Sequence, residues 1–263
     1  MTGVQTCALP IVPYSGTTER ERALLANTQP LTDAEAAEFV DCLLHQREPA
    51  QVELLSKLLL AGRGPRQILD VIQVAAAQVV VRTQGDLNFS LPQHCYEYCS
   101  TLGWFYDTFK HPQRLKLLYL AASYVNQDAW HQRNIRDLGE VDIRAPRETA
   151  GLGAAQILER LQTAVLALDG PQSVAWTQAF IETGADRAPL VERIALLATR
   201  IGNDPHNQEI PQCMLSDYLK NRAPGRDWLL LAAAQHTAKH RKYGDFLEAS
   251  RRFGEAMGVA GLQ

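Results

Sequence analysis

The sequence predicts an all-α protein, a single globular domain of about ten to eleven helices. Three observations predict this class. Apolar residues recur at the three- and four-residue spacing of a buried helical face, proline and glycine separate these segments, and no long stretch alternates polar with apolar residues. The prolines that begin helices are unevenly spaced, which does not favour a solenoid of repeats.

The helices of the first half follow from their start and stop signals. A capping box, Thr32-Asp33-Ala34-Glu35, begins the first helix, and the apolar residues from Ala36 to Leu44 form one face behind it. Proline suits the first turn of a helix and glycine its end. These signals predict further helices at 49–62, 65–81, 92–106 and from 112 to about 131, with a loop over 83–90.

The second half is delimited in the same way. Gly170-Pro171, Gly202 and Pro224-Gly225 interrupt the apolar pattern. The predicted helices are 149–168, 172–183, 188–201, 208–220, 225–241 and 244–256. A charged loop over 136–147 is the best boundary between two helical halves, 31–136 and 148–263, which we expect to pack as one unit.

The first eleven residues, MTGVQTCALPI, resemble the translation of a sequencing adapter. We therefore expect residues 1–11 to be non-native and exclude them from the fold. Residues 12–30 are expected to form a poorly ordered or extended lead-in. Without Cys7 four cysteines remain, and cysteines without a disulfide framework predict free thiols in a reducing, cytoplasmic compartment.

Composition excludes several classes of function. The net charge of −3 provides no basic excess for binding phosphates, which argues against nucleic acid as a partner. The longest apolar run, Trp228 to Ala234, is too short to span a membrane. Dinucleotide-binding, P-loop, nucleophile-elbow and zinc-protease motifs are all absent from the sequence.

Three pairs of side chains could carry chemistry, because each is spaced to share one helical face. They are His94 with Glu97, Asp128 with His131, and His236 with His240. Helix bundles build metal sites from such pairs, and histidines with a carboxylate suit non-haem iron. His94, His131, His236 and His240 are therefore candidate metal ligands. The alternative is that they are ordinary polar residues of helix surfaces.

The segment HCYEYCSTLGW, from His94 to Trp104, is crowded with aromatic residues. Such a segment suits either a pocket for a flat organic ligand or a packed core. In a pocket, His94 could act as a general base. Tyr98 lies one turn further along the helix and could donate a hydrogen bond to an oxyanion.

Two stretches resemble the helical domain of questin-oxidase-like proteins, some of which are fused to Rieske-type iron–sulfur domains. The first spans 58–131: an L-x-x-G turn ending at Gly62, an alanine-rich helix over 74–81, and a histidine-led aromatic helix from His94. The second is the H-T-x-K element, His236-Thr237-Ala238-Lys239, within 232–243. This chain departs from the pattern in having no Rieske ligand set and in being shorter.

The resemblance implies an oxygenase that acts on an aromatic or polyketide-like small molecule. It makes His94 a candidate base, and it makes His236 and Lys239 candidate catalytic residues, with Lys239 stabilising a substrate anion. An iron–sulfur partner protein would fit the same resemblance, and a homodimer is left open. Two alternatives stand beside it: a non-haem iron or di-metal oxidase, and a non-catalytic helical scaffold or accessory protein. The cofactor is thus non-haem iron or none.

Overall fold

The computed structural model describes residues 19–83, 91–135, 143–201, 205–239 and 246–259. Within these ranges the chain is all-α, as predicted, and Gln29 and Arg63 form an isolated parallel β bridge. The described elements are α1 (Glu19–Leu25), α2 (Asp33–His45), α3 (Ala50–Leu60), α4 (Pro65–Arg82), α5 (Leu91–Thr108), η1 (Pro112–Arg114), α6 (Leu115–Ile135), η2 (Arg147–Thr149), α7 (Ala154–Leu166), α8 (Gly170–Glu182), α9 (Ala188–Ile201), α10 (Pro205–Lys220), α11 (Trp228–Lys239) and α12 (Phe246–Met257).

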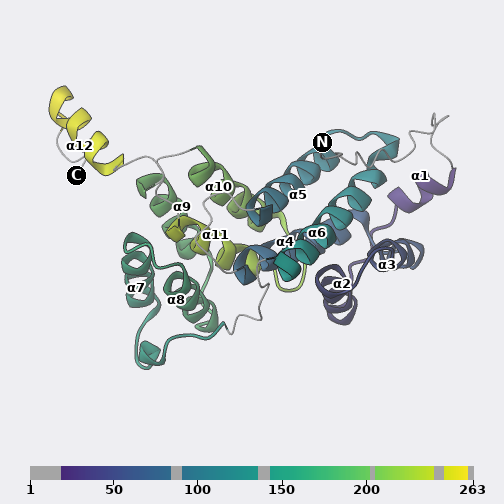
Figure 1. Ribbon diagram of the computed structural model, residues 1–263, viewed down its shortest axis with the longest axis horizontal. Coiled ribbons are helices and arrows are strands. Elements are labelled where there is room, and N and C mark those ends of the chain that lie inside the picture. The colour runs from purple at the N-terminus through teal and green to yellow at the C-terminus, as the bar shows by residue number, and fades with distance from the viewer. Residues whose placement is uncertain (1–18, 84–90, 136–142, 202–204, 240–245, 260–263) are drawn as a thin grey trace.

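Two buried helices, α4 and α11, organise the fold (Figure 1). α4 packs against α2, α5, α6 and α11, while α11 packs against α4 and against α7 to α10. Nearly every residue of both helices is buried, which agrees with an apolar character on all sides rather than on one stripe. One hydrophobic core therefore continues from the first half of the chain into the second.

The capping interactions that the sequence predicts are present at the helix ends. The Thr32 hydroxyl accepts the Glu35 backbone N–H at 3.2 Å, and the Glu35 carboxylate accepts the Thr32 backbone N–H at 2.8 Å. Pro65 occupies the first turn of α4, where its missing N–H removes no helical hydrogen bond. The run Val79-Val80-Val81 continues α4 as the helical period predicts.

Several boundaries differ from the prediction. Residues 19–25 form the short helix α1 where an extended lead-in was expected, while the segment 1–11 lies outside the described residues. α10 begins at Pro205 rather than at 208, because proline is suited to a helix start. α11 begins at Trp228 because Gly225 adopts a positive φ of 77° in the preceding turn. α7 begins at Ala154, preceded by the short helix η2.

Candidate functional site

Helix α5 lies between α6 and α10 on the surface of α4, and its aromatic residues divide between core and surface. Tyr96 is fully buried and Tyr106 is 5% exposed, so both belong to the core. Tyr98, Trp104 and Phe105 are each more than a third exposed. The aromatic segment is thus not a single pocket, because consecutive residues of a helix face different neighbours.

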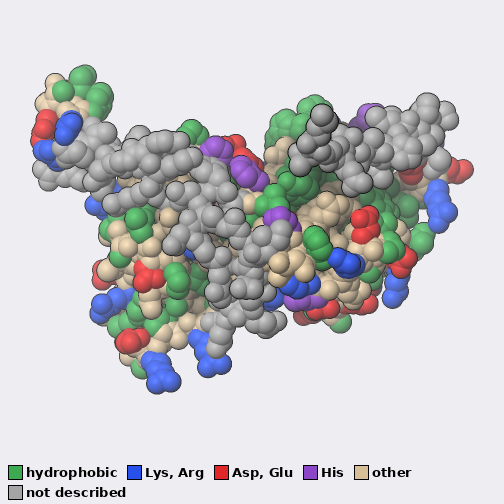
Figure 2. Space-filling view, in the orientation of Figure 1, with side chains coloured by type: hydrophobic (Ala, Val, Ile, Leu, Met, Phe, Trp, Pro, Cys, Tyr) green, Lys and Arg blue, Asp and Glu red, His purple; other side chains and the backbone are tan. Residues whose placement is uncertain are grey.

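The side chains of His94 and Glu97 contact each other on the outer side of α5. The Nδ1 atom of His94 lies 3.0 Å from Oε2 of Glu97, and the His94 side chain is 43% exposed. The ring of His206, in the first turn of α10, meets the His94 ring edge-on at 5.9 Å. Figure 2 shows histidine side chains, in purple, gathered between α10 and α5. A carboxylate that holds one imidazole nitrogen leaves the other nitrogen as the proton acceptor.

His236 belongs to the same neighbourhood but is buried. Its side chain is 1% exposed, and Nε2 lies 3.3 Å from the backbone oxygen of His206. The structure therefore brings together α5, the start of α10 and α11 around three histidines. Lys239, also on α11, lies next to Gly170, the first residue of α8. The stem of Lys239 thus packs on the start of α8.

Two further predicted residues lie on the α6 side of α5. The Tyr98 ring packs against Tyr124 of α6, with ring centres 4.8 Å apart. His131 lines a cavity together with Tyr124 and Asp128. The predicted residue His240 lies outside the described residues.

The described residues contain no group of three or more His, Cys, Asp or Glu side chains that could hold a metal ion. His94, His131 and His236 therefore do not form a three-ligand set. The predicted metal site that also includes His240 stays a prediction, because His240 lies outside the described residues. Asp128 and His131 line the same cavity, and Oδ1 of the buried Asp128 accepts a hydrogen bond from Gln132.

Asp128 is a second chemically unusual group near α5. The residue is 2% exposed, and its Oδ1 accepts a hydrogen bond from Nε2 of Gln132 at 2.9 Å. Its Oδ2 is buried as well. Burial raises the pKa of Asp128 to about 6, and the neighbouring Gln132 and Cys95 only partly oppose this rise. A buried carboxyl of raised pKa beside a cavity is a common sign of a functional site.

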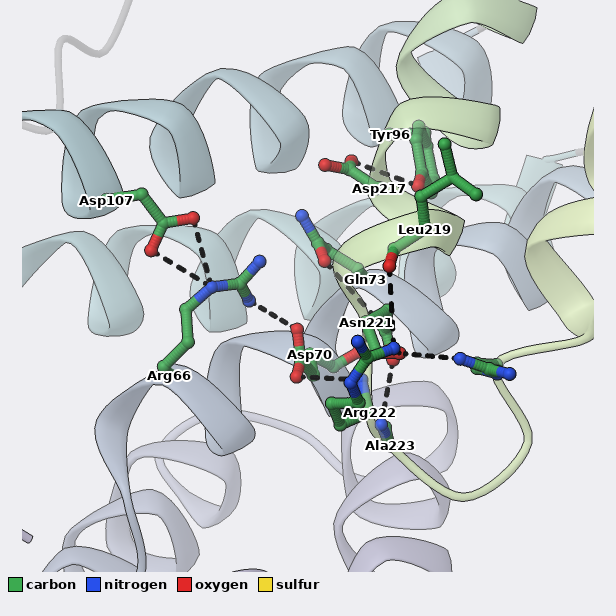
Figure 3. Close-up of polar contacts among 11 residues, drawn as sticks. Arg66, Asp70, Gln73, Tyr96, Asp107, Asp217, Leu219, Asn221, Arg222 and Ala223 are labelled. Atoms are coloured by element: carbon green, nitrogen blue, oxygen red, sulfur yellow. Dashed lines mark hydrogen bonds and ion pairs between the residues drawn. The ribbon is translucent and has the colours of Figure 1, made fainter. Parts of the chain in front are cut away.

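A polar network fixes α10 against α4 and α5, and so sets the position of His206 (Figure 3). The Tyr96 hydroxyl donates to Oδ2 of Asp217 at 3.2 Å. At the end of α10, Nδ2 of Asn221 donates to the backbone oxygen of Asp70 at 2.9 Å, and the Arg222 N–H donates to Oδ2 of Asp70 at 3.1 Å. Burial raises the pKa of Asp70 to about 6, although the Arg66 guanidinium opposes the rise. These bonds satisfy the buried polar groups, so we assign the network a structural role.

Sequence reasoning gave no role to His206, which the structure places beside His94. The two residues are far apart in the chain, and no local pattern predicts their contact.

No family model, curated protein or solved structure matches this chain. The fold and the site define a helical protein with an imidazole–carboxylate couple and a separate cavity, and the questin-oxidase-like resemblance stays a prediction. Within the described residues, no helix is both long and apolar enough to cross a membrane.

Proposed function

We propose that this chain is an enzyme of oxygenase type that acts on an aromatic or polyketide-like small molecule, with His94 as the general base. The observation that supports it most is the 3.0 Å contact between His94 Nδ1 and the Glu97 carboxylate on a side chain that remains 43% exposed. The oxygenase class comes from the resemblance, and the acid–base role comes from the geometry.

The chemistry follows from this couple. A hydrogen bond from Nδ1–H to Glu97 selects the tautomer in which Nε2 carries a lone pair. Nε2 can then take the proton of a phenol or enol, and Glu97 stabilises the imidazolium that forms. The substrate anion is the species that dioxygen would oxidise. His206 lies edge-on to His94 and limits how the ring can turn. We therefore regard Glu97 and His206 as positioning residues.

Oxygen uptake in the presence of hydroxylated anthraquinones and single-ring phenols tests the proposal. Because a general base contributes about 10²- to 10⁴-fold to a rate, His94→Ala should lower turnover by that range. Glu97→Gln keeps the shape of the side chain but removes the charge, and should lower turnover less.

The chain offers a matched control in His45, a partly exposed histidine whose Nε2 lies 3.9 Å from Asp41 on α2. His45→Ala should leave turnover unchanged. Equal rates in the wild type and in His94→Ala, or no uptake with any compound of the panel, would contradict the proposed function.

A second candidate function, a non-catalytic scaffold, is favoured by one observation. Trp104, Phe105 and Phe109 form a surface cluster with ring centres 5.1 to 5.7 Å apart, and each residue is 42% to 54% exposed. Exposed aromatic clusters often mark protein contacts, and here a second copy of the chain is the partner we would test first. Sedimentation should show a dimer in the wild type and a monomer in Trp104→Glu. A wild-type monomer would contradict this candidate.

A further inference from the structure

A cavity of about 350 Å³ lies between α2, α4 and the turn before α11, and shares no lining residue with the His94 couple. Its volume falls within the range of small-molecule sites, about 300 to 1,000 Å³. α2 packs beside α4 (Figure 1), and one face of each helix lines the cavity. The apolar part of the lining includes Ala36, Val40, Leu44 and Val74.

The third wall of the cavity is held in place by buried hydrogen bonds. Pro224 and Gly225 form this wall, directly after the polar network at the end of α10. Nδ2 of Asn221 donates to the backbone oxygen of Asp70 on α4, and Oδ1 of Asn221 accepts the Ala223 N–H at 2.8 Å. The turn is thus fixed to α4, so the cavity is formed before any ligand binds.

Charges of opposite sign line this cavity without pairing with each other. Asp41 comes from α2, whereas Arg82 comes from the last turn of α4. The Asp41 side chain is 65% exposed, and the 3.9 Å from its Oδ1 to Nε2 of His45 exceeds a hydrogen bond. The Arg82 guanidinium lies over the Trp228 ring at 5.5 Å and forms no ion pair with a described residue. Its nitrogens are not among the buried, unpartnered atoms of the described chain, so a ligand can reach both charges.

Gln78 supplies a third polar group, one turn before Arg82 on α4. The residue is 7% exposed, lines the cavity and makes no side-chain hydrogen bond within the described part of the chain. Native structures normally satisfy such a side chain, and the exceptions call for an explanation such as a ligand. A primary amide both donates and accepts hydrogen bonds, so it can pair with a peptide group.

We infer that this cavity binds a short apolar peptide with free ends, of which a dipeptide is the smallest. Its carboxylate pairs with Arg82, its ammonium with Asp41 and its peptide group with Gln78. A guanidinium can bind a carboxylate through two parallel N–H···O bonds. The apolar side chains of the peptide pack on Val40 and Leu44.

The second aspartate of the cavity, Asp33, is not assigned to the ammonium. It lies in the first turn of α2, where the helix dipole already stabilises its negative charge. The inference is independent of His94 and of the proposed reaction, because no residue of that couple lines this cavity.

Calorimetric titration of the full chain at neutral pH tests this inference with three forms of one dipeptide. The probes are leucyl-leucine, its C-terminal amide and its N-acetyl derivative. The free dipeptide should bind at least about tenfold more tightly than the amide, which cannot form the charge-assisted pair with Arg82. It should bind at least about threefold more tightly than the N-acetyl form, since ion pairs of exposed carboxylates are weaker. This comparison needs no variant, so it does not depend on whether a substitution folds.

Variants then assign the site. Arg82→Gln should weaken binding of the free dipeptide at least about tenfold and should abolish its advantage over the amide. Arg47→Gln is the matched control, because the Arg47 guanidinium also lies over a tryptophan ring, that of Trp130 at 4.9 Å, but outside the cavity. It should leave binding unchanged.

The carboxylate is assigned in the same way. Asp41→Asn should abolish the advantage of the free dipeptide over the N-acetyl form, whereas Glu38→Gln, an exposed position of α2 outside the cavity, should preserve it. Four results would each overturn the inference: no binding of the free dipeptide at millimolar concentrations, equal binding of the free form and either derivative, undiminished binding in Arg82→Gln, or an advantage over the N-acetyl form that survives Asp41→Asn.

Discussion

The unfolding free energy of Asp128→Asn, measured against pH, gives the sharpest prediction about stability. In the folded chain burial raises the pKa of Asp128 from 3.8 to about 6. The folded state therefore holds this proton more tightly than the unfolded state does. The stabilising contribution is fully present below pH 3.8, declines as pH rises, and is lost above pH about 6. Each unit of pKa corresponds to about 1.4 kcal/mol, so the whole change is about 3 kcal/mol.

Asparagine does not titrate, so Asp128→Asn lacks this contribution at every pH. Relative to the wild type, the variant should gain about 2.4 kcal/mol between pH 4 and pH 7, with most of the gain below pH 6. Asp70, whose pKa is also raised to about 6, is present in both proteins and cancels in the difference. Urea unfolding followed by circular dichroism measures the two curves. A difference that stays constant from pH 4 to pH 7 would refute the reasoning.

Three substitutions test how the fold is held together. Asn221→Ala should lower the unfolding free energy by about 2 to 4 kcal/mol, because it leaves the Asp70 carbonyl and the Ala223 N–H without their buried partner; an unchanged urea midpoint would contradict this. Thr32→Ala should lower it by about 1 kcal/mol through loss of the capping box, whereas Thr32→Ser should restore it. Phe39→Ala, at a fully buried position of α2, should lower it by about 3 to 5 kcal/mol, and a loss below 1 kcal/mol would show that the site collapses around the smaller side chain.

Local signals were sufficient to predict most of the fold. The capping box at Thr32, the prolines at helix starts and the apolar spacing act over a few residues, so they can be recognised in one sequence. The predicted positions of the helix ends were less accurate. The start of α10 at Pro205 was missed because residues 205–208 are polar and carry no apolar period, while the turn before Trp228 was read as part of the helix.

The candidate site was predictable only where it depends on one helix. The i, i+3 spacing of His94 and Glu97 predicted a shared face, and the structure places the two side chains 3.0 Å apart. The i, i+3 spacing of Asp128 and His131 also placed both residues at one cavity, but it gave no indication that Asp128 would be buried. The approach of His206 and His236 to each other depends on how α10 packs on α11, and no pattern within either helix indicates it.

The central claim is that Glu97 prepares the imidazole of His94 to accept a proton. The tautomer of His94 tests this claim in the absence of any substrate. Long-range proton–nitrogen correlation spectra distinguish the two ring nitrogens at alkaline pH, where imidazoles are neutral. The structure predicts that Nδ1 carries the hydrogen in the wild type and that Glu97→Ala loses this preference. A wild-type His94 with its hydrogen on Nε2 would contradict the claim, because that nitrogen could not then take a proton from a ligand.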